Sequence, residues 1–157
     1  MKKTILFLDQ QSWLGGAQRV LEGVLSTLGS EFNPIVAFPN HGPFRAELAK
    51  RGIETLTIPI GIYRSGKKSY LEIAAFVVRS VLCGFKLAAV IRSRQVALVY
   101  INGPRCLPAG VGGAWRTGRA CLFPLPLSLD REAAVLPVTS FLRPVFQGSA
   151  CSWADPP

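Results

Sequence analysis

Two adjacent glycines, Gly15 and Gly16, stand where a short apolar run gives way to a segment with helical spacing. The run Ile5–Leu8 predicts a strand, and apolar residues recur at helical intervals over Val20–Leu28. Glycines at such a junction let backbone N–H groups approach a ligand closely, and the helix N-terminus adds positive partial charge. The pattern therefore indicates a site for an anion such as a phosphate. The same glycines equally fit a tight turn that binds nothing.

The cysteine and histidine content argues against a structural metal site. His41 is the only histidine, and no C-x-x-C pair occurs among the four cysteines, which are Cys83, Cys106, Cys121 and Cys151. We therefore expect free, mostly buried thiols in a reducing cytoplasm, and no metal or other cofactor.

The composition is typical of a single basic, globular domain. The chain has 157 residues, 49% of them hydrophobic, and its 18 basic and 9 acidic residues give a net charge of +9. Such a charge favours anionic partners, namely a membrane face, nucleic acid or phosphorylated substrates. The basic residues are scattered and have no interleaved aromatic residues, so the sequence does not indicate nucleic-acid binding.

Strand-like and helix-like segments alternate along the chain. Helical patterns fall between apolar runs that predict strands at about 5–8, 35–38, 53–58, 96–101 and 120–123. This alternation predicts an α/β fold, a Rossmann-like three-layer sandwich with a mostly parallel sheet. With the strand order 3-2-1-4-5, the loop Ser12–Gly16 faces the loop Asn102–Arg105 across one crevice, at the edge where such sheets bind ligands.

The segment 70–92 predicts a long apolar helix. Its charged residues Glu72, Arg79 and Lys86 recur every seven positions and form one narrow polar stripe. Cations within the segment disfavour a membrane span, so we expect the helix to cover the sheet as part of the core. We also expect Trp115 to lie in the core.

Two other interpretations of this helix stay open. One is a transmembrane span. The other is a peripheral contact at the inner face of the membrane, in which Arg64, Lys67 and Lys68 and the end of the helix meet anionic lipid.

An ordered series of short motifs resembles family 4 glycosyltransferases. The segment Leu14–Val20 is similar to the GGAE(R) segment that opens the first helix of that family. Asn40–Phe44 resembles the region after the family's second strand, and Val99–Arg105 resembles the loop after its fourth. Ala114–Arg119 is similar to the turn before its fifth strand. The resemblance covers about residues 4–130.

The resemblance implies a GT-B fold, in which two Rossmann-like domains enclose the active site and this chain supplies the N-terminal, acceptor-side domain. Gly15 and Gly16 would then approach the diphosphate of a nucleotide-sugar donor through their backbone N–H groups. Contacts to a glycan or lipid-linked acceptor, or to the sugar, would come from Ser12, Arg19, Asn102 and Arg105. Gln18 stands where the family usually has Glu.

The sequence departs from the family pattern near residue 124. Pro124 and Pro126 stand where many relatives have histidines, and no acidic pair has the E-x7-E spacing of the donor-binding domain. We therefore expect a Rossmann-like domain at 1–130, an irregular or degenerate tail at 131–157, and no donor-binding domain. The resemblance implies a truncated glycosyltransferase that is inactive alone. The alternative is a non-catalytic Rossmann-like binding module or a pseudogene relic.

Overall fold

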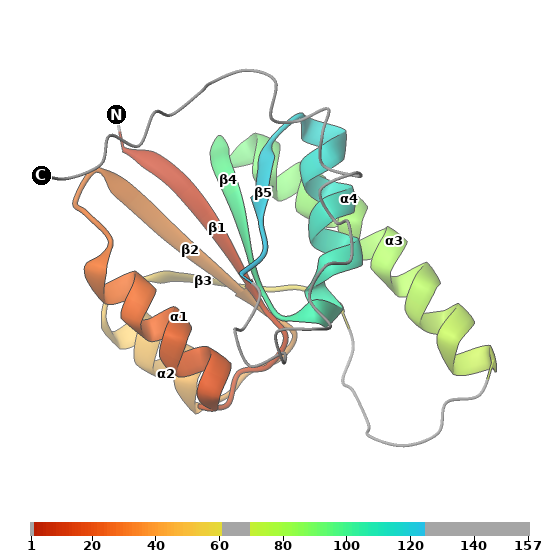
Figure 1. The fold of residues 1–157 in the computed structure, drawn as a ribbon, viewed down its shortest axis with the longest axis horizontal. Helices are drawn as coiled ribbons and strands as arrows, with labels where there is room; N and C mark the ends of the chain where they lie inside the picture. The colour runs from red at the N-terminus through yellow and green to blue at the C-terminus, as the bar shows by residue number, and fades with distance from the viewer. Residues whose placement is uncertain (1, 61–69, 125–157) are drawn as a thin grey trace, which may run out of the picture. The chain divides into compact units, whose positions relative to one another are not determined.

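A computed structural model describes residues 2–60 and 70–124, which form one α/β unit (Figure 1). The alternation of strands and helices is confirmed. The elements are β1 (Lys3–Asp9), α1 (Gly16–Thr27), β2 (Phe32–Phe38), α2 (Pro43–Lys50), β3 (Glu54–Thr57), α3 (Tyr70–Ser93), β4 (Val96–Asn102), a 3-10 turn (Pro104–Cys106), α4 (Leu107–Thr117) and β5 (Ala120–Leu122). The predicted boundary at residue 130, the predicted tail, and the basic residues Arg64, Lys67 and Lys68 lie outside the described residues.

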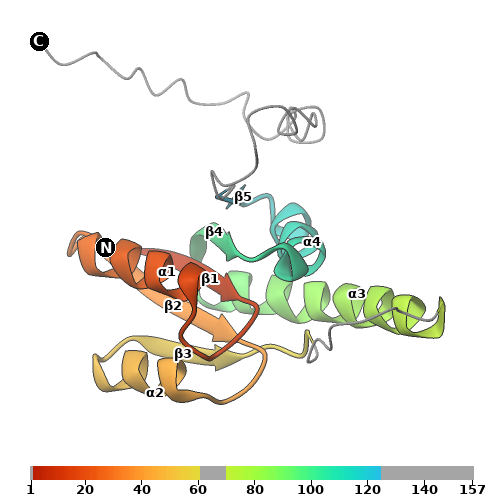
Figure 2. The ribbon, with the colours of Figure 1, turned by 60° about the horizontal axis from the view of Figure 1, so that its bottom comes forward.

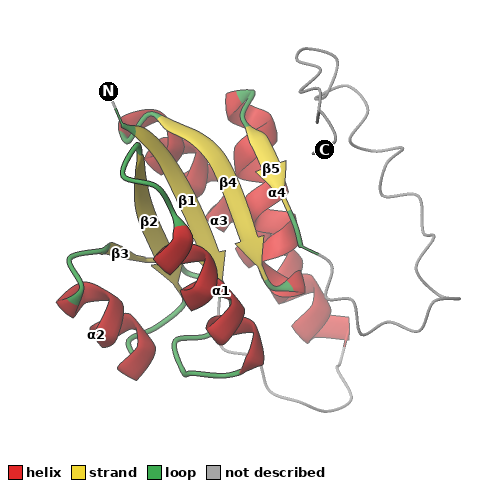
Figure 3. Ribbon diagram, turned by 60° about the vertical axis from the view of Figure 1, so that its left-hand side comes forward, coloured by secondary structure: helices red, strands yellow, loops and turns green. Residues whose placement is uncertain are grey.

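The five strands form one parallel sheet in the predicted order β3-β2-β1-β4-β5 (Figure 3). In this register Leu6 of β1 lies opposite Ile35 of β2 on one side and Val99 of β4 on the other. Strand order reverses at β1, because the chain leaves β3 at one edge and returns as β4 on the far side of β1. The carboxyl ends of β1 and β4 are therefore neighbours at a topological switch point.

Helices cover both faces of the sheet and make the predicted three layers (Figure 3). Side chains of a strand alternate between faces, so β1 contributes to two separate clusters. Ile5 and Phe7 pack with residues of α1 and α2, and Leu6 and Leu8 pack with residues of α3 and α4. The sequence thus places α1 and α2 on one face and α3 and α4 on the other, as right-handed crossovers require.

The helix α3 is a core helix over only part of its length, which corrects the expectation for 70–92. Cys83, Leu87 and Ile91 are buried, whereas the first ten residues are exposed except for the half-buried Phe76. Length explains the difference. A helix of 24 residues is about 36 Å long, and the seven-residue strand β4 is about 23 Å long. The first turns of α3 therefore extend past the carboxyl edge of the sheet (Figures 1 and 2).

Trp115 is not a core residue, contrary to expectation, because its side chain is 76% exposed. The helix α4 turns small residues inward instead. A Cβ atom on Gly113 would lie 2.9 Å from Cβ of Leu87 on α3, and one on Gly110 would lie 2.6 Å from Cδ1 of Ile101. This close packing of α4 against α3 and the sheet leaves the bulky Trp115 on the outer side of the helix.

Candidate functional site

The candidate site lies at the carboxyl edge of the sheet, where β1 and β4 end side by side. Asp9 is the last residue of β1 and pairs in register with Asn102, the last residue of β4. The loop Gln10–Gly15 follows β1 and leads into α1, while Gly103 follows β4 and leads into the short 3-10 turn. The two loops that were predicted to face each other are thus adjacent in the structure.

A buried carboxylate joins these loops. Oδ1 of Asp9 accepts hydrogen bonds from Nε2 of Gln18 at 2.7 Å and from the backbone N–H of Gln11 at 3.0 Å. Its Oδ2 accepts one from Nδ2 of Asn102 at 2.8 Å. Nδ2 of Asn102 also donates to the carbonyl oxygen of Ala17 at 3.1 Å. The network ties the ends of β1 and β4 to the first turn of α1.

Burial governs the electrostatics of this network. Asp9 is fully buried, and the loss of solvation raises its pKa above the ordinary value of 3.8, although its hydrogen bonds to Gln11, Asn102 and Gln18 act in the opposite direction. An amide at position 18 suits this neighbour. Gln18 donates to Asp9, and its Oε1 accepts from Nε2 of Gln11 at 2.9 Å. A carboxylate there would face Asp9 with like charge.

The N-terminus of α1 stays open beside this closed network. Gly15 is the residue that precedes the helix, no side chain caps it, and the first turn contains no acidic residue. The backbone N–H of Arg19 makes the first helical bond, to the carbonyl oxygen of Gly15 at 3.1 Å. Gly16 is exposed, and a Cβ atom on it would meet nothing within 4 Å. The geometry presents free N–H groups and partial positive charge to an anion.

The other predicted site residues lie at the same edge but differ in burial and in hydrogen bonding. Ser12 is fully buried, and its hydroxyl donates to Oδ1 of Asn40 at 2.6 Å. The side chain of Asn102 is likewise engaged within the protein. Arg19 is exposed on the first turn of α1, and Arg105 is half-buried in the 3-10 turn. Ser12 and Asn102 therefore shape the loops, while the two arginines bring positive charge to this edge.

Sequence reasoning missed the network around Asp9. The notable signal was a set of polar residues, Asp9, Gln11 and Gln18, around one strand-to-helix junction. Their partnership depends on the strand register, which places Asn102 opposite Asp9 from 93 residues away. No pattern within a local window contains that pairing.

The remaining candidate chemistry in the described residues is limited. Over residues 2–60 and 70–124, no three His, Cys, Asp or Glu side chains gather as metal ligands would. Cys83 and Cys106 are buried free thiols, as expected, and Cys121 is half-buried. Burial raises the pKa of Cys83 and of Cys121 to about 11, which keeps both thiols protonated at neutral pH.

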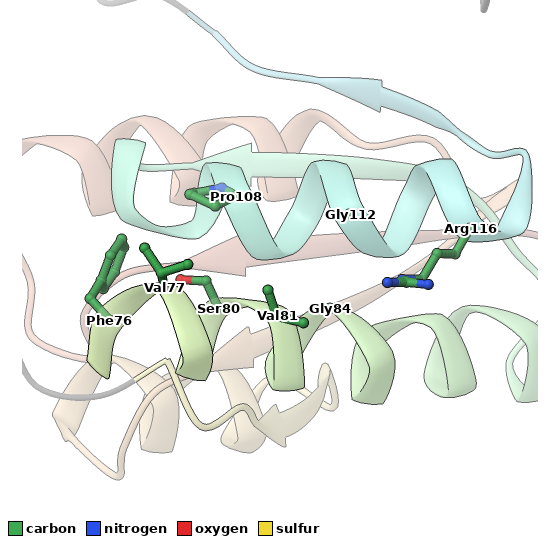
Figure 4. A pocket seen from close by; sticks show the side chains of 8 residues that line it. All are labelled: Phe76, Val77, Ser80, Val81, Gly84, Pro108, Gly112 and Arg116. Atoms are coloured by element: carbon green, nitrogen blue, oxygen red, sulfur yellow. The ribbon is translucent and has the colours of Figure 1, made fainter. Parts of the chain in front are cut away.

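A hollow occurs elsewhere, between α3 and α4 on the outer side of one helical layer (Figure 4). It encloses about 180 Å³ and is largely apolar, with Phe76, Val77 and Val81 on one wall and Pro108 and Gly112 on the other. It does not include the predicted phosphate site, which lies at the N-terminus of α1. The two places are therefore separate features of the molecule.

No protein-family model and no curated protein matches this chain. Solved structures do match its fold. Anabaena HepE in complex with UDP-glucose is 19% identical, with a TM-score of 0.52, over 76% of this chain and 28% of HepE. MurG of Acinetobacter baumannii is 16% identical, with a TM-score of 0.53, over 77% of this chain and 34% of MurG. A UDP-N-acetylglucosamine 2-epimerase is 14% identical, with a TM-score of 0.55, over 78% of this chain and 33% of the epimerase.

These likenesses concern the fold. The chain spans about a third of the length of HepE, MurG and the epimerase, and its sequence identity to each is below 25%. HepE, MurG and the epimerase have the GT-B fold, and the described part of this chain has the Rossmann-like architecture that they share.

Proposed function

We propose that this chain is the acceptor-side domain of a family 4 glycosyltransferase, which moves a sugar from a nucleotide-sugar donor to a glycan or lipid-linked acceptor. One observation carries the proposal. The fold is that of GT-B proteins, among them a neighbour solved with UDP-glucose, and the open N-terminus of α1 lies at the switch point of its sheet. An uncapped helix terminus at that place favours a diphosphate as ligand.

The proposed roles follow from accessibility. Gly15 and Gly16 bind the donor diphosphate through backbone N–H groups, since Gly16 has open space around it. Arg19 and Arg105 add positive charge near the sugar or the acceptor. Ser12 acts indirectly, because its hydroxyl is bound to Asn40. Asn102 and Asp9 hold the β1 and β4 loops in place around the helix terminus.

The chain alone would bind rather than transfer. In a GT-B enzyme two domains enclose the active site, and the matched region is about a third of the length of the neighbours. We therefore propose that these 157 residues do not catalyse sugar transfer in isolation. We also propose that they act in the cytoplasm, where free thiols such as those of Cys83, Cys106 and Cys121 stay reduced. Detection of sugar transfer by the purified chain would contradict this part of the proposal.

The test is a titration of the whole chain with UDP-glucose, followed by amide chemical shifts. We expect the largest shifts at Gly15, Gly16 and Ala17. Gly16→Ala should weaken binding, because its new methyl group stands where the diphosphate approaches, while nothing within 4 Å opposes folding. Gly23→Ala is the matched control, since Gly23 also has open space but lies nearly two turns further along α1.

Two results would refute the proposed phosphate site. One is the absence of shifts at the start of α1 in the presence of UDP-glucose. The other is equal affinity in Gly16→Ala and Gly23→Ala. Inorganic pyrophosphate serves as the comparison ligand. If the chain bound anions only through its net charge of +9, it would bind both ligands, and the amide shifts would not concentrate at the start of α1.

A further inference from the structure

The helix α3 carries an apolar surface that no described residue covers. Leu71 is 82% exposed, and about half of the side chain or more is exposed at the other large apolar positions that form this surface, namely Ile73, Val77, Val78, Val81, Leu82 and Phe85. We call these seven residues the α3 face. Monomeric soluble domains seldom expose an apolar patch of this kind without a binding role, so the α3 face indicates a contact surface.

The α3 face is too short to cross a bilayer while the fold is intact. The 24-residue helix has a mean hydropathy of 1.9 over its most apolar window, so by length and composition it is apolar enough for a transmembrane span. However, the helix is anchored in the core from Ser80 to Ile91. Only 70–79 lies outside the core, which corresponds to about 15 Å of helix against a hydrocarbon thickness of about 30 Å. Such a segment can lie in the interface but cannot span it.

The charges around the α3 face select an anionic partner. The helix carries Arg79, Lys86 and Arg92 against a single acidic residue, Glu72, and α4 beside it contains Arg116 and no acidic residue. The guanidinium of Arg116 lies over the ring of Phe85, 3.9 Å from its centroid. A second copy of this chain would bring the same positive charges face to face. An anionic lipid surface complements both the apolar side chains and the cations.

Two neighbouring features fit the same partner. Trp115 is exposed on α4, in the same outer layer as α3, and tryptophan is a preferred residue at membrane interfaces. The hollow between α3 and α4 opens beside the α3 face, and the hydroxyl of Ser80 within it is buried without a hydrogen-bond partner (Figure 4). An apolar recess with one free hydroxyl suits part of an acyl chain and an ester oxygen.

We propose that the α3 face binds the surface of anionic bilayers, with the exposed first turns of α3 lying in the headgroup region. Connectivity places these turns on the same side of the sheet as the candidate site, because α3 begins after β3 and so starts on the carboxyl side. A bound membrane would then lie on the side of the sheet where the donor site opens. This placement assigns a lipid-linked molecule as the acceptor, a conclusion that rests on the proposed function.

The experiment is co-sedimentation of the whole chain with vesicles of phosphatidylcholine, with or without about 30% phosphatidylglycerol. We expect binding to the anionic vesicles that weakens as salt is raised, and little binding to the neutral ones. Val78→Glu should reduce the partition coefficient about tenfold, through the loss of apolar contact and the added repulsion. Val20→Glu is the matched control, because Val20 and Val78 are 58% and 57% exposed on opposite faces of the sheet.

The outcomes separate this proposal from the proposed function. The proposal that the α3 face binds membranes would be overturned if the chain failed to bind anionic vesicles. It would also be overturned if Val78→Glu and Val20→Glu lowered the partition coefficient equally. A dimer in solution that Val78→Glu dissociates, without vesicle binding, would overturn it in favour of a second copy. Vesicle binding without any response to UDP-glucose would support the membrane contact of the α3 face and refute the proposed donor site. Circular dichroism confirms that each variant is folded before it is compared.

Discussion

Replacement of Gln18 by Glu tests the buried network most directly. In the structure Nε2 of Gln18 donates to Oδ1 of Asp9 at 2.7 Å, and both side chains are fully buried. Gln18→Glu substitutes an acceptor for that donor and brings two carboxyl groups together without water. The pair can avoid like-charge repulsion only by sharing one proton, so it titrates as a unit with one raised pKa.

The magnitude follows from the proton that the pair retains. An exposed Glu has a pKa of about 4.3, so holding its proton costs about 1.4 kcal/mol for each pH unit above that value, or roughly 4 kcal/mol at pH 7. The native state then binds more protons than the unfolded state, and the free energy of unfolding falls as pH rises. At pH 5 the cost is about 1 kcal/mol, because the unfolded chain is then also partly protonated.

Urea denaturation of the purified chain at several pH values between 5 and 8 measures this directly. We expect the stability gap between the original chain and Gln18→Glu to widen by about 1.4 kcal/mol per pH unit. Ala17→Glu is the control, since it adds a carboxylate to the same helical turn at an exposed position. A gap that stays constant with pH, or one that Ala17→Glu reproduces, would refute the network as described.

Three further predictions concern packing and protonation. Gly110→Ala should lower the free energy of unfolding by about 1–3 kcal/mol in urea, because its Cβ would lie 2.6 Å from Cδ1 of Ile101, whereas Gly23→Ala should raise it by up to about 1 kcal/mol. The original chain should lose stability as pH rises from 3.8 through the raised pKa of Asp9, and Asp9→Asn should remove this loss, with thermal unfolding as the measurement. The native Cys83 thiol, with a pKa of about 11, should react with iodoacetamide at pH 8 far more slowly than it does in urea.

Much of the fold was predictable because it depends on local patterns and on topology rules. The apolar runs at Ile5–Leu8 and 96–101 read as buried parallel strands, and the structure has β1 and β4 there. The strand order 3-2-1-4-5 was assumed because it occurs in doubly wound α/β sheets, and the structure has that order. The adjacency of the loops after β1 and β4 is a consequence of that order, so this part of the site was also predictable.

The exposure of α3 could not be predicted from periodicity. Glu72, Arg79 and Lys86 recur every seven residues, which defines a polar stripe but says nothing about which apolar faces are covered. Coverage depends on how far the sheet extends beneath the helix. The relevant signal was length, because a 24-residue helix is longer than a strand of seven residues by about two helical turns.

The structure separates two glycines that the sequence presents as one motif. Neither Gly15 nor Gly16 has the positive φ that a tight turn would demand of glycine; in the described residues that role belongs to Gly52, Gly103 and Gly118. Gly15 has a packing reason, since a Cβ there would lie 2.9 Å from Oε1 of Gln18 and 3.1 Å from Nε2 of Gln11.

Gly16 has no such reason in the fold. Its backbone is helical, a Cβ would meet nothing within 4 Å, and alanine is the better helix former by up to about 1 kcal/mol. A glycine that lowers helix stability and relieves no close contact departs from helix propensity. Such departures are expected where a ligand must approach the backbone. Packing therefore accounts for Gly15. Gly23 and Gly112 also have open space, but of these three glycines Gly16 is the one at an uncapped helix N-terminus, and so it is the residue that favours the anion site.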